Sequence, residues 1–81
     1  MNVQEAVNRA RAAVERRYGE DPRRAWQTAW VDSYAQPNYR IELHVWAGSP
    51  AKGWVIVNHG TQVVIAYDGS GRRIKAWSYQ A

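Results

Sequence analysis

The sequence of 81 residues contains no cysteine. Without thiols, neither a disulfide framework nor a metal site with Cys ligands can form, and this composition fits a cytoplasmic protein. Only two histidines are present, and the carboxylates do not accompany them at the spacing of metal ligands. We therefore expect no metal site and no cofactor.

Long apolar runs are also missing from the chain. No uninterrupted stretch approaches the length needed to cross a membrane. The N-terminus lacks the basic and then apolar pattern of a secretory signal. Together with the short length, these absences predict one cytoplasmic domain, residues 1–81, without a membrane partner.

Acidic residues are scarce: seven Asp and Glu stand against eleven Lys and Arg, which gives a formal net charge of +4. The arginines include adjacent pairs at positions 16–17, 23–24 and 72–73. Such a balance favours acidic partners, nucleic acid included, but only mildly.

A recognisable catalytic site is missing as well. His44 and Glu42 stand two residues apart on one face of a predicted strand, and such a pair could do general acid–base work. However, no nucleophile, oxyanion loop or third orienting group accompanies them. His59 lies in a predicted tight turn, where we expect it to be solvated. The sequence therefore predicts a non-enzymatic protein with no catalytic residues.

The glycine-rich segment 68–71, followed by two arginines, does not have the context of a phosphate-binding loop. A phosphate-binding loop leads into a helix, whereas this segment leads into a predicted strand. We interpret it as a hairpin turn.

The elements that are present begin with a helix at residues 2–18. Apolar residues recur at helical spacing, Asn2 and Glu5 form a capping pair, and Gly19 stops the helix. The apolar stripe is narrow and made of small residues. We expect the charged side chains outside this stripe to point into water, and these are Arg9, Arg11, Glu15 and Arg16.

Strand-like runs follow the helix. Alternating or β-branched patterns predict strands at about 39–47, 53–58, 61–68 and 72–79, joined by turns at 59–60 and 69–71. Residues 25–34 form a fifth predicted strand whose register stays open. A four-residue loop after it would place Trp26 and Trp30 in the core with the helix, and a five-residue loop would place them on the opposite face.

These elements predict an α+β domain with one N-terminal helix packed on a four- to five-stranded antiparallel β-meander. The segment Gln62-Val63-Val64-Ile65-Ala66 resembles the QxVxG loop of cystatins. That resemblance implies a cystatin-like two-layer topology, a helix against an antiparallel meander. It carries no protease-inhibitor residues over to this chain, because the final glycine is missing and the segment lies inside a predicted strand.

Three predicted registers assign each residue to a face of the sheet. They pair Trp46 with Trp54, Ile56 with Val63, and Val63 with Trp77. One face is then small and aliphatic, with Leu43, Val45, Val55, Val57, Val64, Ala66, Ile74 and Ala76. The other face is aromatic and basic, with Arg40, Glu42, His44, Trp46, Trp54, Ile56, Val63, Ile65, Tyr67, Arg73, Lys75, Trp77 and Tyr79.

One helix cannot cover both faces, and its small stripe fits the aliphatic one. The five aromatic residues on the other face represent roughly 750–1,250 Å² of side-chain surface at about 150–250 Å² each. The largest apolar patch on a typical monomer is roughly 300–600 Å². The sequence therefore predicts a partner-binding surface formed by Trp46, Trp54, Tyr67, Trp77, Tyr79, Arg40, His44, Arg73 and Lys75.

Several occupants of this surface are compatible with the sequence. A second copy could form a homodimer, or a different protein could dock on Trp, Tyr and Arg anchors. Single-stranded nucleic acid could stack on the aromatic rings while Arg40, Arg73 and Lys75 meet phosphates. A small ligand, an enzyme site, or cover by segment 20–38 are further alternatives.

We expect a protein-binding module, self-associating, that acts by occluding a partner. Short, Arg-rich proteins without catalytic groups are often inhibitors or adaptors. That class includes phage-encoded inhibitors of host nucleic-acid-processing (CRISPR-like) defence complexes. Direct binding of single-stranded nucleic acid on the same face is the alternative.

Overall fold

The computed structural model describes residues 1–32 and 38–80. One N-terminal helix, α1, packs on a five-stranded antiparallel sheet with the order β1-β2-β3-β4-β5. The predicted α+β architecture is thereby confirmed. The bounds of the elements are α1 Val3–Tyr18, β1 Ala25–Asp32, β2 Asn38–His44, β3 Gly53–Asn58, β4 Val63–Asp68 and β5 Arg73–Ser78.

The helix begins and ends where its sequence indicates. The Asn2 side chain accepts a hydrogen bond from the backbone N–H of Glu5 (2.9 Å), which satisfies one of the free donors of the first turn. At the other end, Gly19 adopts a φ of 96° and donates its N–H to the carbonyl of Glu15. Within the described residues, α1 is neither long enough nor apolar enough to cross a membrane.

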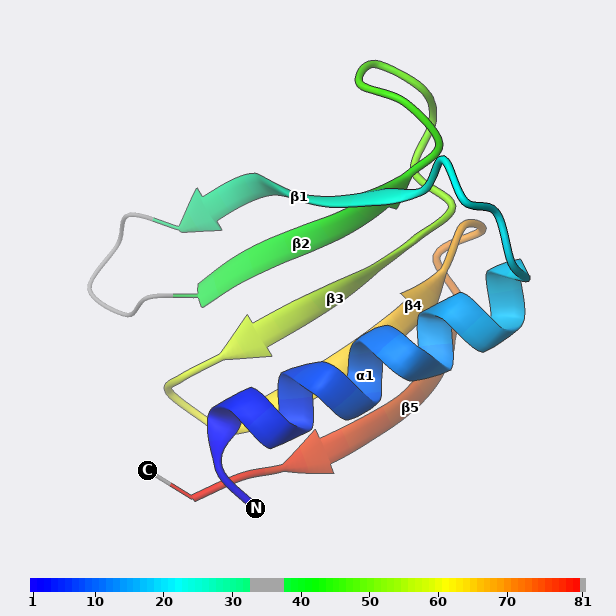
Figure 1. Ribbon diagram of the computed structural model, residues 1–81. Coiled ribbons are helices and arrows are strands. Elements are labelled where there is room, and N and C mark those ends of the chain that lie inside the picture. Colours follow the sequence, from blue (N-terminus) through cyan, green and yellow to red (C-terminus); the bar gives the residue numbers. More distant parts are fainter. Residues whose placement is uncertain (33–37, 81) are drawn as a thin grey trace.

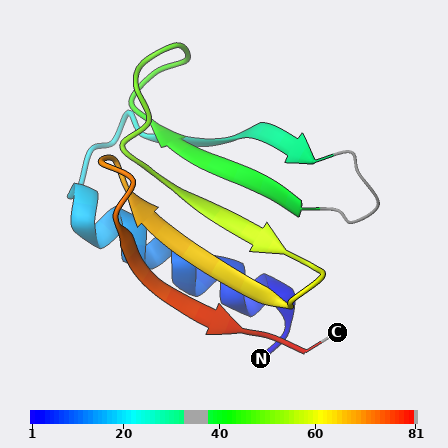
Figure 2. The same ribbon diagram turned by 180° about the vertical axis from the view of Figure 1, so that it is seen from behind.

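The core lies between α1 and the three strands β3, β4 and β5 (Figure 1). The helix buries only small or β-branched side chains, which allow it to approach the sheet closely: Ala6, Val7, Ala10, Ala13 and Val14. The predicted aliphatic face supplies most of the other half, with Leu43, Val45, Val55, Val57, Val64 and Ala66 buried. Seen from behind, the opposite face of the sheet has no described element over it (Figure 2).

Two predicted registers are wrong by an even number of residues, so they leave the faces unchanged. β3 and β4 are joined through residues 59–62 rather than a two-residue turn, and Asn58 pairs with Val63. The Asn58 side chain accepts a hydrogen bond from the N–H of Thr61, which stabilises the wider turn. In the same way, Trp54 pairs with Glu42 and not with Trp46.

β2 ends at His44 because the chain folds into a local turn after it. The N–H of Ser49 donates to the carbonyl of Trp46, and the Ser49 hydroxyl accepts from the N–H of Trp46. Trp46 therefore leaves the sheet. Its side chain is 62% exposed in the loop, which corrects its predicted place opposite Trp54.

The third register is wrong by one residue, and this error matters. Ala66 pairs with Lys75 but Tyr67 pairs with Arg73, so Ile74 is an extra residue in a bulge of β5. Beyond the bulge every side chain turns to the other face. Three residues predicted on the aromatic face therefore lie on the helix side: Lys75, Trp77 and Tyr79. Ala76, which was predicted on the aliphatic face, lies on the opposite side.

A second bulge divides β1. Trp26 pairs with Leu43 and Trp30 pairs with Arg40, with a register shift between Thr28 and Trp30. Trp26 therefore lies on the helix side and packs against the core, as one of the two alternatives from the sequence predicted. The Trp26 indole N–H donates to Glu15 of α1 (2.8 Å), which ties the start of β1 to the helix. The predicted strand residues 33 and 34 lie outside the described residues.

Candidate functional site

The first candidate surface is the side of the sheet that faces away from α1, which we call the open face. Its centre is a pair of isoleucines, Ile56 and Ile65, which lie opposite each other on β3 and β4. All of its apolar side chains are partly exposed. By strand register, the open face includes Arg40, Glu42, Trp54, Ile56, Val63, Ile65, Tyr67, Arg73 and Ala76, and the polar residues Gln27, Asn58 and Ser78.

The aromatic side chains of the open face lie flat. Trp54 and Tyr67 are cross-strand partners whose ring centroids are 5.9 Å apart at an interplanar angle of 20°. On the other side of Trp54, the guanidinium carbon of Arg40 lies 4.0 Å from the ring centroid. Because neighbours hold the indole on both sides, Trp54 forms part of a flat surface and does not protrude as an anchor.

The charges of the open face are paired. Arg40 Nη2 lies 2.8 Å from Glu42 Oε2, and His44 Nε2 lies 2.8 Å from Glu42 Oε1. The other ring nitrogen of His44 lies 2.6 Å from the Ser49 carbonyl, and since a carbonyl only accepts, this nitrogen carries the hydrogen. Glu42 is therefore shared by Arg40 and His44, and the exposed Arg73 is the open-face cation that takes no part in the described ion pairs.

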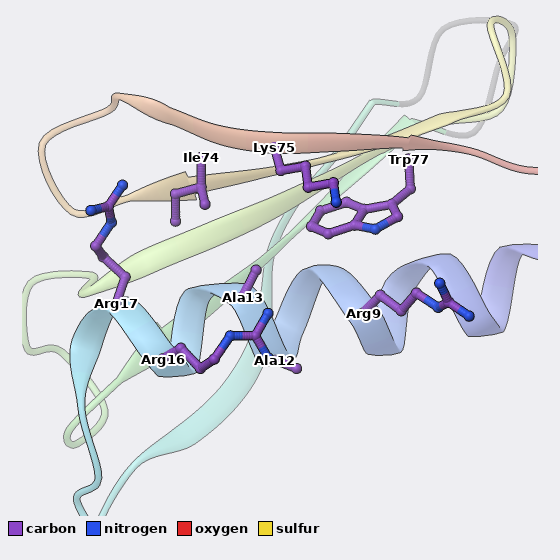
Figure 3. Close-up of a pocket in the computed structure, with 8 residues that line it drawn as sticks. All are labelled: Arg9, Ala12, Ala13, Arg16, Arg17, Ile74, Lys75 and Trp77. Atoms are coloured by element: carbon purple, nitrogen blue, oxygen red, sulfur yellow. The ribbon is translucent and has the colours of Figure 1, made fainter.

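The second candidate surface is a groove of about 570 Å³ between α1 and β5, which we call the basic groove. Two alanines of α1, Ala12 and Ala13, leave space there because their side chains are short. Around them lie four cationic side chains and one indole (Figure 3). The complete lining is Arg9, Ala12, Ala13, Arg16, Arg17, Ile74, Lys75 and Trp77.

The bulge at Ile74 builds the strand side of this groove. It turns Lys75 and Trp77 toward α1, with the Lys75 Nζ 5.5 Å from the Trp77 ring centroid. Figure 3 shows the lysine amine beside the indole and the arginine side chains extending from the helix opposite. Trp77 is partly buried against the core and also lines the groove.

The groove is electrostatically unlike the open face. No carboxylate is among its lining residues. In the part of the chain that the structure describes, the ion pairs are formed by Arg23, Arg24, Arg40 and His44, and none of these residues lines the groove. The hydrogen bond from the Ser70 hydroxyl is the main cause that lowers the pKa of Asp68, and the charge of Arg17 adds a small contribution.

The predicted site residues do not form one surface. Arg40, Trp54, Tyr67 and Arg73 share the open face, and the buried His44 borders it through Glu42. Lys75 and Trp77 line the basic groove, and Trp46 is exposed in a loop. These positions follow from the registers and the lining residues.

Tyr79 lies in the core and is not available for binding. It is 6% exposed, and its hydroxyl lies 2.6 Å from Nδ1 of His59. Burial raises the pKa of Tyr79. His59 is partly buried between Tyr79 and Tyr39, so its predicted solvated position in the turn is wrong.

The sequence alone does not identify the three arginines that α1 contributes to the groove: it predicts Arg9 and Arg16 in water and gives no role to Arg17. Arg9 and Arg16 are seven residues apart, which places them on one side of a helix. Alanines of the apolar stripe lie between them. This pattern was visible in the sequence, but the strand that faces it was not.

Among residues 1–32 and 38–80, no three His, Cys, Asp or Glu residues gather as metal ligands. The His44–Glu42 pair forms, but it lines neither the basic groove nor the smaller cavity beside Gly19. Comparison of the chain with protein-family models, with curated proteins and with solved structures finds no match in any of the three.

Proposed function

We propose that this protein is a non-enzymatic protein-binding module that self-associates through the open face. The observation that carries the proposal is the row of partly exposed apolar side chains on a sheet face with no described cover. Burying such side chains against a second sheet contributes about 25 cal/mol for each Å² removed from water.

The chemistry of the open face favours a dry protein contact. Its central strands carry Ile56, Val63 and Ile65, and Glu42 balances Arg40. A phosphate chain would find one exposed cation there, Arg73, whereas apolar packing would meet little charge to desolvate.

The shape of the open face favours a second copy over an unrelated partner. Trp54 is held flat by Tyr67 and Arg40, and flat sheets pack face to face about 10 Å apart. The same patch on two copies is self-complementary about a twofold axis. Five strands spaced about 4.8 Å apart give a face of roughly 20 by 25 Å. Both copies together would then bury about 1,000 Å², the lower limit of a specific interface, so we expect a reversible dimer.

The test is the solution mass of the protein, measured by sedimentation over a range of concentrations. We expect a dimer for the wild type and a folded monomer for Ile65→Arg, because the substitution places a charge at the centre of the open face. Trp46→Ser is the matched control, since Trp46 is exposed outside that face, and it should stay dimeric. A monomeric wild type, or a dimeric Ile65→Arg, would contradict the proposal.

The hypothesis that such a dimer inhibits a nucleic-acid-processing defence complex stays a prediction from the sequence. It needs a partner of a second kind, and the open face would be occupied by the other copy.

A further inference from the structure

We infer that the basic groove is a binding site for single-stranded nucleic acid. Its cationic side chains meet successive phosphates, and one base stacks on Trp77. This site lies on the helix side of the sheet and not on the predicted aromatic face. The inference rests on the charge of the lining, the spacing of that charge, and the partly exposed indole of Trp77.

The charge of the lining selects an anion. Arg9, Arg16 and Arg17 come from α1 and Lys75 comes from β5, and none of the lining residues is acidic. Four cations around a groove whose lining has no acidic residue raise the local potential there and attract negative ligands. Carboxylates lie outside this lining: Glu15 and Glu20 line the neighbouring cavity, which shares Arg16 with the groove.

The spacing of the charge selects a polyanion. Arg9 and Arg16 lie seven residues apart on α1, which is about 10 Å along the helix axis at 1.5 Å per residue. A single phosphate cannot contact both ends of such a row. A chain that carries one negative charge per unit can follow it.

The indole selects a nucleic acid among polyanions. Trp77 lines the groove beside the cations, and every nucleobase has a flat face that can stack on such a ring. Acidic peptides lack that feature. Lys75 already lies beside the Trp77 ring, so it is within reach of the phosphate that accompanies the stacked base.

A single strand fits better than a duplex. In a duplex the bases are stacked on each other, so their faces are not available to a tryptophan that lines a protein groove. The groove and the open face lie on opposite sides of the sheet. A dimer formed through the open face would therefore leave both grooves accessible.

The experiment measures binding of labelled oligothymidine and oligouridine by fluorescence anisotropy. For single strands, the slope of log affinity against log salt is about −0.7 for each phosphate contacted. Four contacts give a slope of about −3, so affinity should fall about 50-fold between about 50 and 200 mM salt. Binding of either oligomer with this dependence supports the site, and binding of neither overturns it.

Charge variants locate the site. Arg9→Gln combined with Arg16→Gln should halve the slope, so that the same change in salt lowers affinity only about seven-fold. The control is Arg11→Gln combined with Lys52→Gln, which removes the same number of positive charges. Neither residue lines the groove, and Arg11 lies on the same helix. If the control pair weakens binding as much as the groove pair, the assignment to the groove is wrong.

A second set of measurements tests the ligand class. Trp77→Leu should weaken binding about five-fold or more, and Trp77→Tyr should retain it because the aromatic face is kept. Circular dichroism checks that each variant is folded. Equal affinity of Trp77→Leu and Trp77→Tyr would overturn the nucleic-acid assignment. It would also be overturned if polyglutamate displaced the oligomer as effectively, per charge, as unlabelled nucleic acid does. The monomeric Ile65→Arg variant should bind the oligomers as the wild type does, and loss of binding in it would place the site on the open face.

Discussion

The two sides of the sheet differ in how their cations are balanced. On the open face, Arg40 is balanced by Glu42 and stacks on Trp54. In the basic groove, four cations line a cavity that contains no carboxylate. Apolar contact and polyanion binding need opposite electrostatic conditions. In this protein the two surfaces that suit them lie on opposite sides of one sheet.

β5 contributes to both surfaces because of its bulge. Arg73 before the bulge lies on the open face, whereas Lys75 and Trp77 after it line the groove. The single extra residue, Ile74, therefore divides the aromatic and basic residues of one strand between two sites. It also brings Tyr79 into the core, so the burial of that ring stabilises the register that builds the groove.

The largest effect on this arrangement should come from Gly53, where α1 approaches the sheet. A Cβ at this position would lie 2.5 Å from Val14 Cγ1 and 2.8 Å from the Tyr67 carbonyl oxygen. Gly53→Ala should lower the free energy of unfolding by about 2–3 kcal/mol, measured by chemical denaturation. The clash pushes α1 away from β3, so it should weaken oligonucleotide binding more than dimerisation.

Gly48→Ala is the matched control for that clash. Gly48 has a φ of 88° but no atoms close to its Cβ position, so only backbone strain of about 1 kcal/mol is expected. Equal costs at Gly53 and Gly48 would mean that the close approach of α1 does not position the groove.

A smaller effect is expected when the balance of charge on the open face is removed. Glu42→Gln leaves Arg40 and His44 without their shared carboxylate, at a cost of about 1–2 kcal/mol in the free energy of unfolding. The dimer should also weaken about ten-fold, because each copy gains positive charge in the contact. Sedimentation measures this change, and Glu5→Gln, on the exposed side of α1, is the control. An unchanged dimer in Glu42→Gln would show that Glu42 has no part in the contact.

The smallest effect concerns Asp21, which belongs to neither surface. Hydrogen bonds from the Arg23 side chain lower the pKa of Asp21 to about 2. Because the pKa is lower in the folded state, the stabilisation is present above about pH 4 and is lost as the pH falls toward 2. The melting temperatures of wild type and Asp21→Asn should therefore differ at neutral pH and converge near pH 2. A constant difference across this range would count against the Asp21–Arg23 pair.

The sequence predicts the layers of this fold because a register error of an even number of residues leaves every side chain on the same face of the sheet. The turns after β2 and β3 shift their registers by even numbers of residues. Leu43, Val55 and Val64 therefore stay on the helix side whichever turn is chosen. The same reasoning places Trp54 and Tyr67 correctly on the opposite face.

The divided site could not be predicted in the same way. A bulge changes parity, and no residue type requires one at Ile74, where an alternating strand fits the sequence as well. The competing register wins because it buries Tyr79 and packs Ile74 and Trp77 on the core. Those contacts depend on α1, which lies more than fifty residues away in the chain, and the arginines of α1 become a site only when β5 faces them.

The most direct test of two separate surfaces is a salt titration of dimerisation and of oligonucleotide binding on the same wild-type protein. Each copy carries a formal net charge of +4, and salt screens the repulsion between copies as well as the attraction to phosphates. The dimer should therefore hold or strengthen as salt rises from about 50 to 200 mM, while oligonucleotide affinity falls about 50-fold. If both equilibria weaken together with the same slope, one basic surface serves both, and the separation described above is wrong.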